Sequence, residues 1–387
     1  MRTLLQLLLL LQSANDVIVQ GDFVGTGGIT YSVDPTGNAD STQAIQLAFQ
    51  KAMWVNLTDE DSYVRAQSVP TVRFPSGRYK ISDTIRVFPV CVIEGSKAII
   101  TQTDATKVSF DLDGATDVTI KGIRFDGGAT AVSIRNKNVN GSVFLLEECR
   151  FDNIKGPAVI AKGSGDGNIM SANLSLIRCR ARLCDKLLVT YCDQTLIDNC
   201  WNQWSQSAPA GSYICNMRGD LSIVNRTMFV PQDFTAFPIM HTWISSAGAS
   251  TSVTARDSRF SGEFGGIPII TNGVAPNDPG GVPSSVYVTR MSTSVSFHNC
   301  QLSAGPSKNT TSAVLNMQMP CAFTLENNSY LIDVPIVTMS GTAKAMLPKL
   351  QNKLKVKISR NQSWPDIDAN WPSSSRCPSE LFPYMVR

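Results

Sequence analysis

The sequence predicts an all-β protein folded as a solenoid of stacked strands, with a helix covering its first end. Three observations lead to this prediction: a repeated octet, an apolar pattern of period two inside each copy, and an amphipathic segment before the first copy. The 387 residues are 43% hydrophobic, only 17% are charged, and the net charge is +3. The chain can therefore bury a substantial core, and it lacks the basic character that favours nucleic acid as a partner.

The N-terminal segment, residues 1–14, has the order of a secretory signal peptide. Arg2 precedes an apolar run from Leu4 to Leu11, and two small residues follow. The run is too short to span a bilayer comfortably, and an uncleaved apolar anchor is the alternative. Sequons for N-glycosylation also favour a secreted glycoprotein. They lie at Asn56, Asn140, Asn173, Asn225, Asn309, Asn327 and Asn361.

Residues 15–60 are expected to form an N-terminal cap. The segment DPTGNADSTQAIQLAFQKAMW (34–54) is rich in turn residues and then becomes amphipathic. Asp40 is the expected N-cap, with Gln43 at the capping-box position. A helix here can cover the strand edges that a solenoid leaves open at its end. Its apolar face consists of Ile45, Ala48, Phe49, Ala52 and Met53.

Eight copies of the octet lie within residues 61–365, the expected solenoid. They start at residues 118, 144, 174, 195, 221, 253, 295 and 323, and a degraded ninth copy starts at 356. The first and third positions are apolar in nearly every copy, usually with Ser or Thr between them, which is typical of a half-buried strand. The fifth position is Gly, Asn or Asp in six copies, and these residues tolerate a left-handed backbone. Each strand should therefore end in a tight bend, and two further short strands should complete the coil.

Like residues at like positions favour parallel strands stacked about 4.8 Å apart. A β-sandwich is the alternative, and it predicts antiparallel neighbours joined by two-residue hairpins. The segment VPTVRFPSGRYKISDTIRV (69–87) should supply the first coils. Residues 366–387 break the pattern and are expected to form a C-terminal flap or an oligomer contact.

Cysteines recur at the sixth position of the repeat. Because Ile123 occupies this position in the first copy, it should point inward and hold free, buried thiols stacked on successive coils. A disulfide between adjacent coils is the alternative. The other cysteines are better placed for disulfides, above all Cys192 with Cys215 on neighbouring third strands. The spacing of Cys and His predicts no metal site. The sixth-position cysteines are Cys149, Cys179, Cys200 and Cys300.

Two segments resemble a known family. DPTGNADSTQAIQLAFQKA resembles the opening D-x-x-G-x-x-D-[ST]-x-A-I-x-x-A of the pectate-lyase-like superfamily, and VRFPSGRYKISDTIRV resembles its F-P-x-G-x-Y partner motif. The resemblance covers about residues 27–365 and implies a right-handed, single-stranded parallel β-helix. It also implies action on carbohydrate, because the superfamily includes polysaccharide lyases, glycoside hydrolases and phage tailspike depolymerases.

Enzymes of this superfamily place their chemistry near the third strand of the coil. The sequence lacks the signature motifs of polygalacturonase-like hydrolases and of calcium pectate lyases, so site candidates must come from individual residues. Glycoside hydrolysis needs two carboxylates about 5 to 9 Å apart. The candidate acid–base pairs are Asp185 with Asp193, and Asp193 with Asp220.

A lyase would use a different set of residues. Lys186 or His241 would act as the base, and a cation such as Ca²⁺ would neutralise a uronate. Trp243 is a candidate for stacking on a sugar ring, and Glu263 is a further substrate-binding candidate. No other cofactor and no structural metal are expected.

The function that these features favour is cleavage of an extracellular or cell-surface polysaccharide by a hydrolase or lyase. The alternatives are a glycan-binding or adhesion protein without catalysis, and a structural virion spike component, which would be a homotrimer. The expected location is outside the cell or on a virion surface. Polysaccharide is the expected partner, with no nucleic acid and no stable membrane span.

Overall fold

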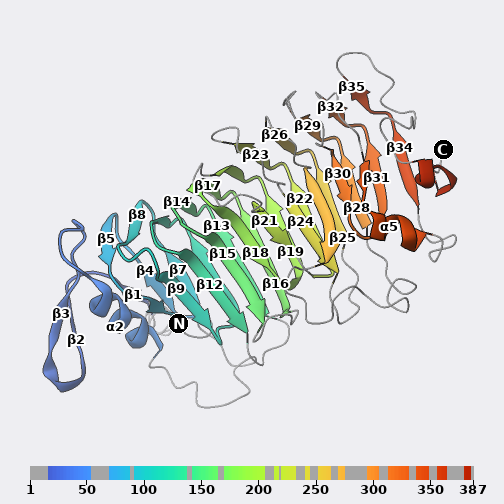
Figure 1. Ribbon diagram of the computed structural model, residues 1–387. Helices are drawn as coiled ribbons and strands as arrows, with labels where there is room; N and C mark the ends of the chain where they lie inside the picture. The colour runs from blue at the N-terminus through green and yellow to red at the C-terminus, as the bar shows by residue number, and fades with distance from the viewer. Residues whose placement is uncertain are drawn as a thin grey trace, which may run out of the picture.

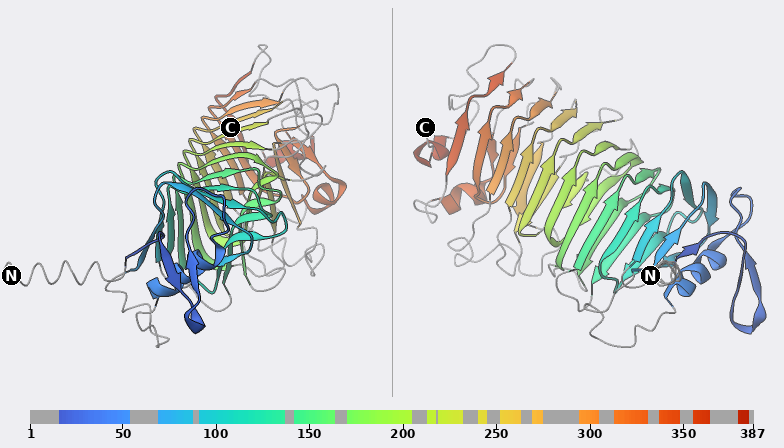
Figure 2. Two further views of the ribbon diagram at one scale, coloured as in Figure 1. Left: turned by 90° about the vertical axis from the view of Figure 1, so that its left-hand side faces the viewer. Right: turned by 180° about the vertical axis from the view of Figure 1, so that it is seen from behind.

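The chain winds into a coil with three short strands per turn (Figure 1). A computed structural model describes residues 16–53, 69–87, 91–136, 142–163, 170–204, 213–217, 219–231, 240–244, 252–262, 269–274, 294–304, 313–330, 337–347, 355–363 and 379–384. Within them, three long parallel sheets enclose one core, and Figure 2 shows the coils stacked along one axis. The fold is a right-handed, single-stranded parallel β-helix, so the predicted fold class is confirmed and the sandwich alternative is wrong.

The first sheet holds the strands that the octets predicted. Its order is β1 (Val17–Ile18), β4 (Thr71–Arg73), β7 (Cys91–Glu94), β10 (Val118–Lys121), β13 (Ser142–Glu147), β16 (Met170–Ile177), β19 (Cys192–Asp198), β22 (Leu221–Asn225), β25 (Ser252–Arg256), β28 (Ser294–His298), β31 (Ala322–Glu326) and β34 (Val356–Ser359).

The second sheet follows the bend after each first strand. Its order is β5 (Gly77–Ile81), β8 (Ala98–Gln102), β11 (Arg124–Asp126), β14 (Arg150–Asp152), β17 (Arg180–Cys184), β20 (Trp201–Trp204), β23 (Met228–Pro231), β26 (Arg259–Gly262), β29 (Gln301–Ala304), β32 (Ser329–Tyr330) and β35 (Gln362–Ser363).

The third sheet closes each coil. Its order is β6 (Ile85–Arg86), β9 (Val108–Asp113), β12 (Thr130–Asn136), β15 (Pro157–Gly163), β18 (Lys186–Thr190), β21 (Cys215–Met217), β24 (Met240–Ile244), β27 (Ile270–Val274), β30 (Leu315–Met317) and β33 (Val337–Met339). Outside the coil lie the hairpin β2 (Asp22–Val24) and β3 (Thr30–Ser32), helices α2 (Thr42–Met53) and α5 (Gly341–Met346), and short 3₁₀ segments at Thr26–Gly28 and Ser379–Tyr384.

The octets align position by position in the first sheet, with one correction. Phe144 pairs with Leu174, and Leu174 pairs with Thr195, as the repeat predicts. Thr195 then pairs with Ser222 rather than Leu221. The copy expected at residue 221 therefore begins one residue later.

The bend after the first strand is left-handed in every described copy. The residues with positive φ are Gly122, Glu148, Arg178, Asn199, Arg226, Asp257, Asn299, Asn327 and Arg360. Glu148 and Arg178 adopt this conformation although their residue types do not favour it. Their N–H groups donate to the carbonyls of Ile177 and Asp198 on the next coil, both at 2.9 Å. Stacking of coils therefore holds the bend, whichever side chain is present.

The core is built from inward residues that stack from coil to coil. Phe125 and Phe151 lie with ring centroids 5.8 Å apart and planes 13° apart. Phe229 and Phe260 stack in the same way at 5.2 Å. Such ladders bury large apolar surfaces along the axis, which is the main stabilising term of a solenoid.

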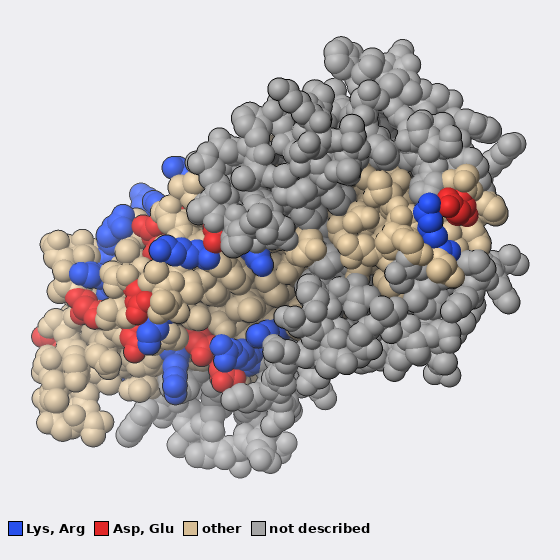
Figure 3. Space-filling model, viewed as in Figure 1, with Lys and Arg blue, Asp and Glu red and all other residues tan. Residues whose placement is uncertain are grey.

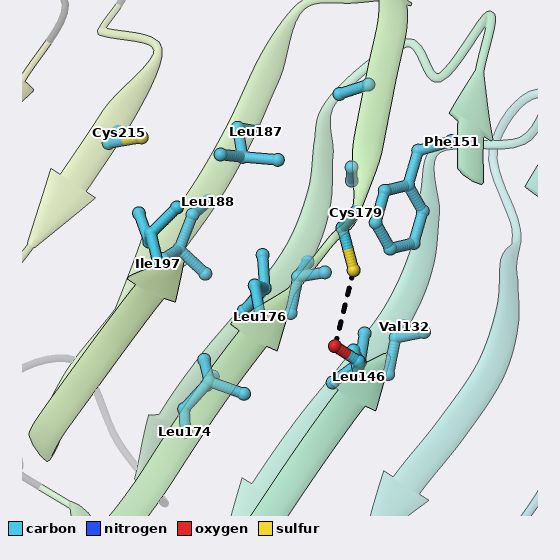
Figure 4. Close-up of a cluster of buried hydrophobic side chains, with 14 of the residues drawn as sticks. Val132, Leu146, Phe151, Leu174, Leu176, Cys179, Leu187, Leu188, Ile197 and Cys215 are labelled. Atoms are coloured by element: carbon cyan, nitrogen blue, oxygen red, sulfur yellow. Dashed lines mark hydrogen bonds between the residues drawn. The ribbon is translucent and has the colours of Figure 1, made fainter. Parts of the chain in front are cut away.

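The sixth position of the repeat also points inward, as predicted. Figure 4 shows the Sγ of Cys179 beside the carbonyl oxygen of Leu146, at 3.3 Å. Its neighbour Cys149 raises the pKa of Cys179 well above the usual value. All nine described cysteines are free and buried, so the expectation of free thiols is confirmed. The buried sixth-position residues are Ile123, Cys149, Cys179, Cys200, Thr227, Ser258, Cys300, Asn328 and Asn361.

The predicted disulfide between Cys192 and Cys215 is wrong. Both are free thiols. Cys192 begins β19 of the first sheet, whereas Cys215 begins β21 of the third sheet, so they do not lie on neighbouring strands. Burial raises the pKa of Cys192 to about 12, which makes it an inert core thiol. Cys377 lies outside the described residues.

Helix α2 covers the first end of the coil (Figure 1). Four of its predicted apolar positions are buried, and the ring of Phe49 meets that of Phe110 edge-on at 5.8 Å. The helix begins at Thr42, because the carbonyl of Ser41 accepts the N–H of Ile45 at 2.9 Å. The cap is thus one residue later than expected, and Asp40 instead accepts the N–H of Thr42 at 2.9 Å.

The proposed ends of the chain fall largely beyond the described ranges. Residues 1–15 and 364–378 are outside them, so the signal peptide and the C-terminal flap stay predictions. Among the described residues, no helix is long and apolar enough to cross a membrane.

Candidate functional site

Asp185 and Lys186 lie where the second strand of one coil turns into the third. The N–H of Asp185 donates to the carbonyl of Ile154 at 3.0 Å, and Lys186 is the first residue of β18. Burial lowers the pKa of Lys186, and the nearby charge of Asp185 opposes that shift. A lysine of this kind is easier to deprotonate than a surface lysine, as a general base requires.

Asp193 and Asp220 occupy equivalent places on neighbouring coils. Gln194 pairs with Leu221, so the two preceding aspartates are adjacent in register, about 4.8 Å apart along the axis. Asp185 and Asp193, in contrast, lie at opposite ends of the five-residue strand β18. That strand alone spans roughly 16 Å, which exceeds the separation of a glycosidase carboxylate pair. The structure therefore brings together only the second of the two expected pairs.

His241 and Trp243 both lie on β24, two residues apart. His241 pairs with Asn216 on one side and Thr271 on the other. Glu263 lies outside the described residues. The roles of these three residues stay predictions.

A groove on the outer face of the second sheet unites residues that sequence reasoning did not single out. It has a volume of about 410 Å³ and is lined by Arg150, Arg180, Arg182 and Trp201, which we call the Arg–Trp groove. These residues come from three successive strands, β14, β17 and β20. Arg150 pairs with Arg180, and Arg180 pairs with Trp201, so the three form a row parallel to the axis.

This row consists of the residues at the seventh position of each octet. The sixth residue points into the core, so the alternation of a strand directs the seventh outward. The signal was therefore present in the sequence, as an arginine after the sixth position in four copies. The residues of the row, in order, are Arg124, Arg150, Arg180, Trp201, Met228, Arg259, Gln301, Ser329 and Gln362.

Two carboxylates neutralise the arginines at one side of the groove. The side chain of Asp152 is only 4% exposed, and its Oδ2 lies 2.7 Å from Nε of Arg124 and 2.8 Å from Nε of Arg150. Asp126 pairs with Arg78 at 3.4 Å. Basic side chains are visible at the upper left edge in Figure 3, above the region of β5, β8 and β14.

Arg180 and Arg182 differ from these arginines. Both are exposed, and among the described residues neither has a carboxylate within ion-pair distance. Trp201 is half-buried beside them and still presents part of its ring in the groove. The groove thus offers two uncompensated guanidinium groups next to an aromatic surface.

The fold is shared with solved virion proteins. The tailspike protein of E. coli bacteriophage HK620, a mutant in complex with a hexasaccharide, is 12% identical over 91% of this chain and 67% of its own, with a TM-score of 0.55. A double mutant of that tailspike is 13% identical over 90% and 66%, with a TM-score of 0.53. The chain has the β-helix fold of these tailspikes.

A bacterial surface protein is also similar in structure to this β-helix. The surface adhesin PfbA of Streptococcus pneumoniae is 12% identical over 89% of the chain and 92% of its own, with a TM-score of 0.40. No family model matches the sequence, and no curated protein matches it.

A second groove on the β-helix is polar and lacks aromatic residues. It has a volume of about 360 Å³ and is lined by Asn299, Cys300, Gln301, Asn327, Asn328, Ser329 and Arg360. The amide of Asn328 is already committed to the core, since it accepts the N–H of Cys300 at 2.9 Å and donates to the carbonyl of Phe297 at 3.0 Å. The Arg–Trp groove is therefore better equipped to recognise a ligand.

The described part of the β-helix brings together no three His, Cys, Asp or Glu side chains that could hold a metal ion. The calcium ion that a lyase would require stays a prediction.

Proposed function

We propose that the chain binds a polysaccharide on the outer face of the second sheet, in the Arg–Trp groove. The observation that carries the proposal is Trp201 in an open groove beside two arginines that have no carboxylate partner among the described residues. The indole ring offers an apolar face on which the C–H face of a sugar can stack. Each guanidinium offers five N–H donors to hydroxyl or carboxylate oxygens.

The shape of the site suits a linear polymer. The groove spans three successive coils, from Arg150 on β14 to Trp201 on β20, which is two coil steps or about 10 Å. A polymer laid across the groove can contact all three coils at once, which raises its affinity without demanding a deep pocket. The tailspike with this fold was solved in complex with a hexasaccharide, which supports a carbohydrate as the ligand.

Cleavage of the polymer is the second candidate. It is favoured by Asp193 and Asp220, which lie one coil step apart. Backbones one step apart are separated by about 4.8 Å, so the two carboxylates can reach the separation of about 5 Å found in retaining hydrolases. Such a site would lie away from the Arg–Trp groove, since the two aspartates stand at the start of the first sheet.

Binding is tested with immobilised polysaccharides and the full-length protein. We expect at least one polysaccharide to bind, and Trp201→Ala to weaken its Kd about tenfold or more, since losing a stacked aromatic costs about 1.4 kcal/mol. Met228→Ala, the next residue of the row outside the groove, is the matched control and should leave the Kd unchanged. Failure of every polysaccharide to bind, or wild-type affinity of the Trp201→Ala variant, would overturn the proposal.

Cleavage is tested on the polysaccharides that bind. Release of reducing ends indicates a hydrolase, and ultraviolet absorbance of an unsaturated product indicates a lyase. Asp193→Asn and Asp220→Asn should each abolish hydrolysis if the pair is catalytic. Intact polymer after prolonged incubation leaves binding as the function of the groove.

A further inference from the structure

We infer that the ligand of the Arg–Trp groove is an acidic polysaccharide, with carboxylate or sulfate groups held by Arg180 and Arg182. The inference deepens the proposed function and rests on it. The evidence for it is the charge pattern of three consecutive strands of the second sheet, which changes from neutral to positive at the groove.

The pattern is visible in both sequence and register. Strands β11 and β14 read Arg-Phe-Asp, whereas β17 begins Arg-Ala-Arg. The first and third residues of each triplet face outward, and they align as Arg124, Arg150 and Arg180 in one row and as Asp126, Asp152 and Arg182 in the other. Arg182 therefore occupies the place where the two previous coils hold an aspartate. The first two triplets are neutral, and the third carries two positive charges.

This placement is unfavourable for the protein alone. Arg150 and Arg180 are direct neighbours in the sheet, and like charges directly opposite each other are destabilising. Asp152 cannot compensate Arg180 as well, since its carboxylate already lies between Arg124 and Arg150. A bound anion between Arg180 and Arg182 removes this repulsion.

At several other places on the surface a cation is paired with a carboxylate of a neighbouring coil. At the first bend, Arg178 contacts both Glu147 and Glu148, and Arg226 contacts Asp198. On the last coils, Lys357 lies 2.9 Å from Glu326. Stacking can thus supply opposite charges. At the groove, however, the register neighbour of Arg180 is Arg150, and Asp152, the register neighbour of Arg182, is already paired with Arg124 and Arg150.

The geometry fits an acidic sugar. Arg180 and Arg182 lie on the same face of one strand, about 6.6 Å apart at two residues' rise. Both guanidinium groups can therefore reach one carboxylate or sulfate, each with the fork of donors that matches its oxygens. Trp201 is the register neighbour of Arg180, so a sugar on the indole ring places its acidic group beside the arginines.

A polysaccharide fits this surface better than a single-stranded nucleic acid. Proteins that bind single strands stack successive bases on several aromatic side chains along a basic channel. The seventh-position row contains one aromatic residue, Trp201, and its other members beyond the groove are mostly neutral. The net charge of +3 is also small for a nucleic-acid partner.

The test compares matched polymers by their Kd for the full-length protein. One pair is a uronate-containing polysaccharide and its carboxyl-reduced product, and the other is a sulfated polysaccharide and its desulfated product. We expect one acidic member to bind about tenfold or more tightly than its neutral product, with affinity falling as salt rises from about 50 to about 200 mM. The pair that shows the difference identifies the acidic group.

Arg182→Asp is the decisive variant, because it recreates the triplet that the two previous coils already carry. It should lose about tenfold or more in affinity for the acidic polymer while its circular dichroism spectrum stays that of the wild type. Arg182→Lys should retain part of the affinity. Arg259→Gln, which removes an exposed arginine of the same row outside the groove, should bind as the wild type does.

The outcomes separate this inference from the proposed function. Equal binding of acidic and neutral polymers, still weakened by Trp201→Ala, overturns the acidic ligand and leaves polysaccharide binding intact. Binding of single-stranded DNA in preference to every polysaccharide overturns both. Wild-type affinity of the Arg182→Asp variant for the acidic polymer also contradicts the inference.

Discussion

Replacing Asn202 with leucine is expected to stabilise the protein. Asn202 is 2% exposed and faces the core of the coil, between Ala181 and Phe229 in register. Its Nδ2 and Oδ1 atoms are buried without a hydrogen-bond partner. An unpaired buried amide costs about 1–3 kcal/mol, and a leucine of similar size removes that cost. With roughly 2.1 cal/mol/K per residue over 387 residues, the melting temperature should rise by about 1–4 °C.

The same substitution at Asn328 should have the opposite sign. Asn328 is 1% exposed, accepts the N–H of Cys300 at 2.9 Å, and donates to the carbonyl of Phe297 at 3.0 Å and to Asn361 at 3.1 Å. Asn328→Leu leaves these buried groups unpaired and should cost at least about 2 kcal/mol. Scanning calorimetry of the two variants and the wild type provides the comparison. If Asn202→Leu destabilises the protein as much as Asn328→Leu does, the unpaired amide of Asn202 does not cost stability.

Two further predictions concern protons and thiols. Hydrogen bonds from Ala39, then from Thr36, lower the pKa of Asp34 from 3.8 to about 2, so its contribution to stability is present above pH 3.8 and is lost as the pH falls through about 2. The difference in melting temperature between the wild type and Asp34→Asn should therefore shrink as the pH falls from 3.8 to about 2. A difference that stays constant down to about pH 2 would contradict this prediction. Burial raises the pKa of Cys91 and Cys300 to about 12, so iodoacetamide at about pH 8 should modify none of the nine described cysteines before denaturation. Peptide mass spectrometry reads out the labelled sites, and a labelled thiol in the native protein would show that the core opens.

The repeat could be predicted from the sequence because its pattern of apolar and turn residues lies within short segments of the chain. The inward residues and the sixth position follow from period two, and the structure buries them as expected. The error at the fifth copy arose because Leu221 and Ile223 are apolar and alternate, whereas the first inward position of this strand is occupied by the polar Ser222. Ser222 and Val224 are the buried ones, while Leu221 and Ile223 are half-buried. Only the left-handed bend at Arg226 fixes the register there.

The site was harder to predict from the sequence because it depends on which residues of different coils lie next to each other. Asp185 and Asp193 looked close in sequence, yet strand β18 separates them, whereas Asp193 and Asp220 meet only through the register of β19 with β22. The sequence pattern places Cys192 on a third strand, although the first strand of the next coil already begins there. The arginines of the groove were visible in the repeat, but the pairing of Asp152 decides which of them are left uncompensated.

The most direct test of the account is a crystal structure of the full-length protein with an acidic oligosaccharide derived from the polymer that binds. We predict a sugar ring on Trp201 and its carboxylate or sulfate between Arg180 and Arg182. An oligosaccharide bound on the third sheet or at Asp193 and Asp220, with the Arg–Trp groove empty, would contradict it.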